Sequence, residues 1–212
     1  MATANRLSSA IRSATGALAM GLALLAPFHA GAQQAALTFD EPLFLGNVQT
    51  GTTVTRFFGS GIGSNLWTYP WTSNAYIRSL ALWKFWPVAF QNDPCPRDGI
   101  SGPTKPGCVA VRIAFPSDAG IDIAPPARDL SAGAQAVVAK EDFDTDVWEL
   151  VQGGIPHVVI LKNGHNPNVC LSASGARNSP ARVMLADCDI NDQAQMFMLF
   201  NKAGGWVWPG GF

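Results

Sequence analysis

Apolar residues in this chain fall into short runs that alternate with polar residues or are separated by Gly, Pro, Asn and Asp. This spacing is typical of β-strands, and no segment shows the pattern of a long amphipathic helix. The sequence therefore predicts an all-β protein. Twelve strands are expected: Leu43–Val48, Thr53–Phe58, Asn65–Trp71, Leu80–Trp86, Val109–Phe115, Gly120–Ala124, Ala134–Lys140, Val147–Val151, His157–Lys162, Asn168–Ala173, Arg182–Ala186 and Gln195–Phe200.

The strand pattern repeats along the chain. A shift of 49 residues superposes three pairs of segments: Val147–Leu150 on Met196–Leu199, Gly120–Ile123 on Val169–Ser172, and Val111–Ile113 on Ile160–Lys162. An earlier copy runs from Leu43 to Trp86 and places Trp86 at the position of Trp148 and Phe197.

Three four-stranded copies predict a β-trefoil, a six-stranded barrel closed at one end by three hairpins. Closing the barrel removes the exposed strand edges of an open sheet. Trp86, Trp148 and Phe197 would fill the shared core. The segment between the first two copies is then an insertion loop, and a β-sandwich with a similar number of strands is the alternative architecture.

The first 32 residues have the features of a secretory signal. Arg6 and Arg12 precede an apolar stretch, Ala17–Phe28, and small residues follow at Ala30–Ala32. The apolar stretch is shorter than the ~20 residues that a membrane-spanning helix needs. We expect cleavage after Ala32, a linker over 33–42, a domain over 43–212, and a protein secreted to the periplasm or beyond.

Charge and composition exclude one class of partner. Removal of the signal leaves 12 basic and 15 acidic side chains, a formal charge of −3. Nucleic-acid binding requires a basic face, so no nucleic-acid partner is expected.

All four cysteines lie in the mature chain, and an even number in an exported protein predicts two disulfides. Of the three possible pairings, Cys95–Cys108 and Cys170–Cys188 each close a short loop. The first would staple the insertion loop. The alternative, a metal site, requires closer cysteine spacing, and we expect neither a metal ion nor a cofactor.

The third copy resembles the repeat of ricin-type lectins. It combines Cys170-Leu171, a later Cys188 and Gln195-Met196-Phe197, which stands where the family has Gln-x-Trp. Together with the signal, the short lead and an aromatic first copy, it looks like the A and C subunits of cytolethal distending toxins. The resemblance implies a trefoil without catalysis that escorts a nuclease-like subunit to host cells.

The resemblance also identifies where a sugar would bind. Ricin-type sites hold an Asp two residues after the Cys of the second strand, and an Asn beside the Gln. Those positions are Ser172 and Ala194 in the third copy. In the second copy the alignment gives Ile123 and Thr145, with Asp122 one residue away and Asp146 in the place of the Gln. Galactose-type binding at these positions is therefore expected to be weak or absent.

Aromatic residues are concentrated in the first copy. Trp67, Tyr69 and Trp71 alternate and share one face of a strand, while Trp83 and Phe85 share a face opposite Trp86. Such rings either pack in the core or form an exposed surface that binds a glycan, a lipid or a protein. We expect Trp67, Tyr69, Trp71 and Trp83 to form the binding surface. The Trp-rich tail over 204–212 is consistent with either a terminal strand or a partner contact.

Catalysis is not expected. The mature chain holds only His157 and His165, and it contains no Gly-x-Ser-x-Gly motif. The acidic segment Glu141–Asp146 lacks the glycine and the distal glutamate of a calcium hand, so it is interpreted as a polar turn.

The sequence thus predicts a non-catalytic subunit of a secreted bacterial toxin. Its partners would be other toxin subunits, including a nuclease-like one, and a glycan, lipid or protein on the host cell surface. The alternatives are a free-standing lectin module and a trefoil protease inhibitor, for which the Cys95–Cys108 loop would supply a rigid surface.

Overall fold

In the computed structural model of the protein, the described residues are 35–36, 41–56, 61–87, 109–116, 118–126, 129–140 and 145–208. The signal, Cys95, Cys108 and most of the acidic segment lie outside them. The strands are β1 (Ala35–Ala36), β2 (Leu43–Asn47), β3 (Thr52–Thr55), β4 (Trp67–Pro70), β5 (Leu82–Pro87), β6 (Val109–Phe115), β7 (Asp118–Ala124), β8 (Val137–Lys140), β9 (Val147–Gln152), β10 (Val159–Asn163), β11 (Val169–Ser172), β12 (Ala181–Arg182), β13 (Met184–Asp187), β14 (Met196–Phe200) and β15 (Trp206–Trp208); the one helix among the described residues is α1 (Ala75–Ser79).

All twelve predicted strands are present with shifted ends, and the predicted strand Arg182–Ala186 is divided into β12 and β13. Two elements were not predicted: β1 within the expected linker, and α1 after β4. The tail contains β15, which agrees with one of its two expected roles. Asn74 caps α1 by accepting hydrogen bonds from the backbone N–H groups of Tyr76 and Ile77. No helix in the described part of the chain is long and apolar enough to cross a membrane.

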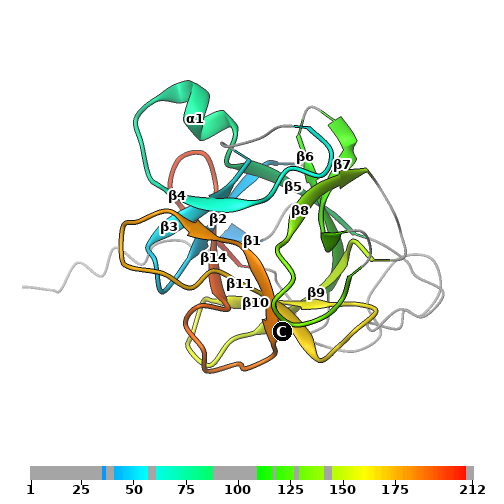
Figure 1. The fold of residues 1–212 in the computed structure, drawn as a ribbon. Helices are drawn as coiled ribbons and strands as arrows, with labels where there is room; N and C mark the ends of the chain where they lie inside the picture. Colours follow the sequence, from blue (N-terminus) through cyan, green and yellow to red (C-terminus); the bar gives the residue numbers. More distant parts are fainter. Residues whose placement is uncertain are drawn as a thin grey trace, which may run out of the picture. The chain divides into compact units, whose positions relative to one another are not determined.

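Six antiparallel strands form a closed barrel (Figure 1). The strands pair in the order β2, β5, β6, β9, β10 and β14, and β14 returns to pair with β2. The three pairs β3–β4, β7–β8 and β11–β13 form the hairpins of the first, second and third repeats. The fold is therefore a β-trefoil, as the sequence predicts.

The barrel interior is made of two layers, because each barrel strand directs two large side chains inward. One layer holds the largest rings, Trp83, Trp148 and Phe197, from the last strand of each repeat. The next layer holds Phe85, Leu150 and Leu199, whose register partners on the neighbouring strands are Ile113, Leu161 and Leu45.

This pairing corrects the repeat alignment. Ile113 and Leu161 occupy equivalent positions, so the first strand of the second repeat aligns with that of the third at a shift of 48 residues, one fewer than predicted. The last strand keeps the shift of 49. A change of one residue turns a strand's side chains to the other face. Val111 therefore corresponds to Val159 in the core and not to Ile160, which packs outside the barrel.

The three hairpins are joined by a cycle of backbone hydrogen bonds. Leu66 N–H donates to Ala136 O at 2.8 Å, Ala136 N–H donates to Val183 O at 2.8 Å, and Val183 N–H donates to Leu66 O at 3.1 Å. All three residues are fully buried. One equivalent residue from each repeat thus closes the end of the barrel, which satisfies polar groups that would otherwise be buried without partners.

Two short strands extend the sheet beyond β14. β15 pairs antiparallel with β14, and β1 pairs in parallel with β15. The tail therefore contains a terminal strand.

The predicted disulfide Cys170–Cys188 is present, with Cα atoms 5.0 Å apart. It joins the start of β11 to the turn after β13 within the third repeat. It packs outside the barrel against Val158, Ile160 and Met196.

Replacing Cys170 and Cys188 together with alanine is expected to lower the free energy of unfolding by about 3 kcal/mol. The disulfide closes a short loop and restricts the unfolded chain. Urea unfolding of the double variant checks this value. Because the double variant already lacks the Cys170–Cys188 bond, reducing agent should cause no further loss of stability through this bond. A double variant as stable as the oxidised wild type would contradict the expectation.

Candidate functional site

Two of the predicted aromatic assignments are exchanged in the structure. Trp83 was expected at the surface, but its side chain is 0% exposed and its indole N–H donates to Val54 O at 2.9 Å. Trp148 makes the equivalent bond to Ile123 O at 3.0 Å. Trp83 is therefore the repeat aromatic of the first copy, and its assignment to the binding surface is wrong.

Trp86 was expected in the core and instead points outward from β5. It is half-buried, and the Lys84 ammonium lies 3.9 Å from its ring centroid. Trp83 and Phe85 are buried on the inner face of β5, and strand alternation then places Trp86 on the outer face.

Trp67 and Tyr69 share the outer face of β4, as the alternation predicts, and both are half-buried. The Arg182 guanidinium lies over the Trp67 ring at 5.5 Å. Tyr69 lines a small hollow together with Ile77 and Arg78. The three predicted rings therefore follow one another along the chain without forming a single exposed platform.

Trp71 is the exposed member of this group. Its side chain is 50% exposed, and it follows β4 directly. One edge contacts the buried Phe44 ring, with the centroids 4.7 Å apart, and the Arg78 guanidinium lies 4.7 Å from the Trp71 centroid. Arg78 in turn donates to Lys202 O at 3.3 Å. Trp71 is thus held in place while half of its surface stays accessible.

An open groove of about 670 Å³ begins at Trp71. Its lining combines the outer faces of β2 and β14, which run side by side in Figure 1, with the loop before β12. Met198 and Phe200 supply apolar surface from β14, and Arg177 supplies a guanidinium. Only Trp71 of the groove was predicted as a binding residue; Arg177, Met198 and Phe200 were not.

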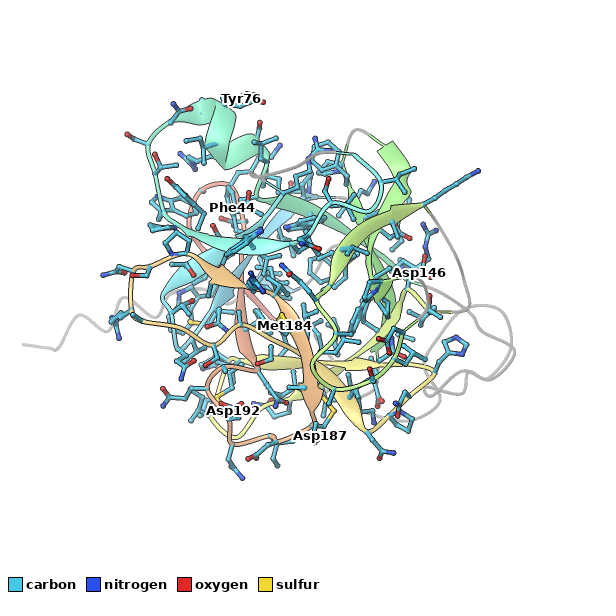
Figure 2. All side chains as sticks on the ribbon, viewed as in Figure 1. Phe44, Tyr76, Asp146, Met184, Asp187 and Asp192 are labelled. Carbon is cyan, nitrogen blue, oxygen red and sulfur yellow. A yellow bond between two sulfur atoms is a disulfide. The ribbon has the colours of Figure 1, made fainter. Side chains whose placement is uncertain are left out.

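Gly46 shapes the floor of the groove. A Cβ atom at this position would lie 2.9 Å from Phe200 Cε2, closer than side chains tolerate. Because Gly46 has no Cβ atom, the Phe200 ring can lie against β2. Phe44, which is buried, pairs with Phe200 across the two strands and packs against the Trp71 ring. It lies below Tyr76 and α1 in Figure 2.

The turn after β2 is internally bonded. The Asn47 side chain donates to Ala194 O at 2.7 Å and accepts from Thr50 N–H at 3.0 Å. Thr53 Oγ1 donates to Tyr69 O at 3.3 Å. The side-chain donors of Asn47 and Thr53 are therefore used within the protein, and these bonds hold the turn in place beside the groove.

The loop that carries Arg177 is tied to the same turn. Asn178 N–H donates to Thr50 O at 2.6 Å, and Gly175 N–H donates to Gln49 Oε1 at 3.4 Å. Arg177 is exposed, and it makes no hydrogen bond or ion pair with the residues that the structure describes. No Asp or Glu belongs to the described lining of the groove.

The lectin positions of the third repeat are closed. Ser172 is 7% exposed and Ala194 is buried. The Ala194 carbonyl accepts a hydrogen bond from Ala173 N–H. Gln195 is also buried: it accepts from Asp189 N–H and donates to Asp187 O, so it braces the preceding loop. These residues maintain the fold and offer no open polar pair to a sugar.

The second repeat contains a buried charge cluster at the corresponding place. Arg112 Nε donates to Asp122 Oδ2 at 2.7 Å and lies 3.6 Å from Asp146 Oδ2. Burial and the hydrogen bond with Asp146 raise the pKa of Asp122 to about 8, although Arg112 acts in the opposite direction. With the corrected shift, Asp122 occupies the position of Cys170. Asp122 and Asp146 are both 0% exposed, so neither acid is open to a ligand. Figure 2 shows Asp146 on the side of the barrel away from α1.

The two described histidines have different neighbours. His157 lies against the Trp206 ring at 5.7 Å, and His165 N–H donates to Asn163 Oδ1 at 2.9 Å. Over the described ranges, no three His, Cys, Asp or Glu residues are arranged to hold a metal ion.

The sequence matches no protein-family model and no curated protein. Solved structures do resemble this fold. The Rhizoctonia solani agglutinin is 11% identical, with a TM-score of 0.54 over 79% of this chain and 100% of that one. A chain of the Haemophilus ducreyi cytolethal distending toxin is 16% identical, with a TM-score of 0.53 over 77% and 86%. The designed three-fold protein ThreeFoil is 17% identical, with a TM-score of 0.56 over 74% and 96%. At these identities the likeness establishes the β-trefoil fold.

Proposed function

We propose that this chain is a non-catalytic binding subunit of a secreted bacterial toxin, which attaches its partners to the host cell surface through the Trp71 groove. The observation that carries the proposal is the groove itself. It combines an exposed, fixed tryptophan with an apolar floor, and its volume is in the range of small-molecule sites. Exposed aromatic surface of this kind favours a binding function.

The fold supports the same proposal, since a lectin and a chain of a toxin share it. The toxin role further requires partner subunits, including a nuclease-like one, and export by the signal over residues 1–32. Purification of the secreted chain with its bound proteins tests both requirements.

A free-standing lectin is the second candidate, because the groove alone is sufficient to bind a glycan. The two functions differ in their requirement for a partner. A lectin should bind cells alone and agglutinate them, whereas a toxin subunit should make cell killing depend on the other subunits.

Replacing Trp71 with alanine is expected to reduce cell-surface binding at least tenfold, because its half-exposed ring offers a large aromatic contact surface in the groove. Flow cytometry with the labelled protein measures the loss. The melting temperature should change by only a few degrees, since half of the side chain is already in solvent.

Trp67→Ala is the matched control, because Trp67 lies on the same face of β4 under Arg182 and does not line the groove. It should bind cells as the wild type does. Equal loss in both variants, or unchanged binding by Trp71→Ala, would show that the groove is not the attachment site.

A further inference from the structure

We infer that the ligand of the Trp71 groove is a carboxylated sugar, held by the Arg177 guanidinium. This inference rests on the proposed function, because it names the class of ligand that the same groove binds. Three features of the described lining support it: the charge, the availability of polar groups, and the size.

The charge of the groove is unbalanced. Arg177 is a charged lining residue with no ion pair among the described residues, and the described lining contains no carboxylate. Arg78 adds a second cation beside Trp71, but its guanidinium is already bonded to Lys202 O. An anionic ligand would supply the missing negative charge.

The polar groups around the groove differ in availability. Asn47 and Thr53 make hydrogen bonds within the protein, whereas Arg177 has none to the described residues. A ligand therefore finds one strong donor, and a guanidinium binds a carboxylate through two parallel hydrogen bonds. The bonds from Asn178 and Gly175 to the β2–β3 turn fix the backbone on either side of Arg177.

The remaining surface suits a ring with an apolar face. Trp71, Met198 and Phe200 offer apolar contact next to the guanidinium. A volume of about 670 Å³ accommodates one to a few sugar rings and is small for a protein partner. One guanidinium balances one carboxylate, whereas a chain of many sulfates would require several cations.

The experiment compares the full secreted chain and three variants against matched probes. The probes are lactose, sialic acid linked to lactose, the methyl ester of that sugar, and a glucuronic acid glycoside. The wild type is expected to bind the two carboxylated sugars at least tenfold more tightly than lactose or the ester, as measured by calorimetry. Arg177→Gln should remove this preference, and Arg177→Lys should retain part of it.

Arg182→Gln is the control variant. It removes the same charge from an exposed position over Trp67, outside the described lining of the groove, and it should leave the preference intact. Vesicles that contain phosphatidylserine distinguish a lipid carboxylate from a sugar carboxylate. Binding to these vesicles without binding to the free sugars would overturn the inference.

The other outcomes are equally decisive. Equal affinity for the acid and its ester, or an unchanged preference in Arg177→Gln, would show that the carboxylate is not recognised. If Trp71→Ala still abolishes cell binding in that case, the groove remains the attachment site and only the ligand class is wrong. If Trp71→Ala binds cells normally, the proposed function itself fails.

Discussion

Replacing Trp83 with alanine is expected to lower the free energy of unfolding by about 3–5 kcal/mol. The change removes the largest ring that the first repeat contributes to the barrel core, and the cavity it leaves is bounded by strands that cannot close inward. It also removes the donor to the Val54 carbonyl, which is buried. Urea unfolding followed by circular dichroism measures the loss.

Two further variants separate these contributions. Trp83→Phe replaces the indole with a smaller aromatic ring and removes the hydrogen bond, as in the third repeat, where Phe197 stands naturally; it should cost about 1–2 kcal/mol. Trp86→Ala removes a half-buried ring from the outer face and should cost about 1 kcal/mol. If Trp86→Ala were more destabilising than Trp83→Ala, the assignment of inner and outer faces in β5 would be wrong.

The exchange of Trp83 and Trp86 shows what alternation in a sequence can establish. Alternation groups Trp83 with Phe85 and places Trp86 on the other face, and that grouping is confirmed. It does not establish which face is inside. The decision depends on the pairing of β5 with β2 and β6, and the insertion after β5 removes the spacing that would have aligned the first repeat with the others.

The repeat itself was predictable, because turns and apolar strands recur in the same order. The predicted alignment of the second and third repeats is wrong by one residue in their earlier strands. The shift of 49 that relates Trp148 to Phe197 holds only for the last strand of each repeat. The structure shows 48 for the earlier strands. A single residue decides whether Asp122 aligns with Leu171 in the core or with Cys170 outside it.

The groove was less predictable than the fold. Its described walls come from segments that are far apart in the chain, and neither Arg177 nor Phe200 is part of a recognisable motif. Gly46 inside an apolar strand was the available signal, since a glycine there often marks close approach by another group. The group that approaches, Phe200, is known only once β14 is paired with β2.

The largest electrostatic effect is expected from Arg112→Leu, which should lower the free energy of unfolding by about 3–5 kcal/mol near pH 8. The change leaves Asp122 and Asp146 buried beside each other without the guanidinium that balances them. Urea unfolding at several pH values measures this loss. The triple variant Arg112→Ile, Asp122→Ala, Asp146→Gln follows the apolar design of the third repeat and should recover most of the stability, because it leaves no buried charge.

The pH dependence of the wild type tests the same cluster. The pKa of Asp122 rises from 3.8 in an unperturbed side chain to about 8 in the fold, chiefly through burial and then through the hydrogen bond with Asp146. The folded chain therefore holds a proton that the unfolded chain releases. This contribution to stability is complete below about pH 4 and is lost as the pH rises through about 8. The wild type should be less stable at pH 9 than at pH 5, and Asp122→Asn, which cannot ionise, should lose much less over that range. Parallel pH profiles for the two proteins would mean that Asp122 carries its charge throughout, in which case Arg112 outweighs burial at this site.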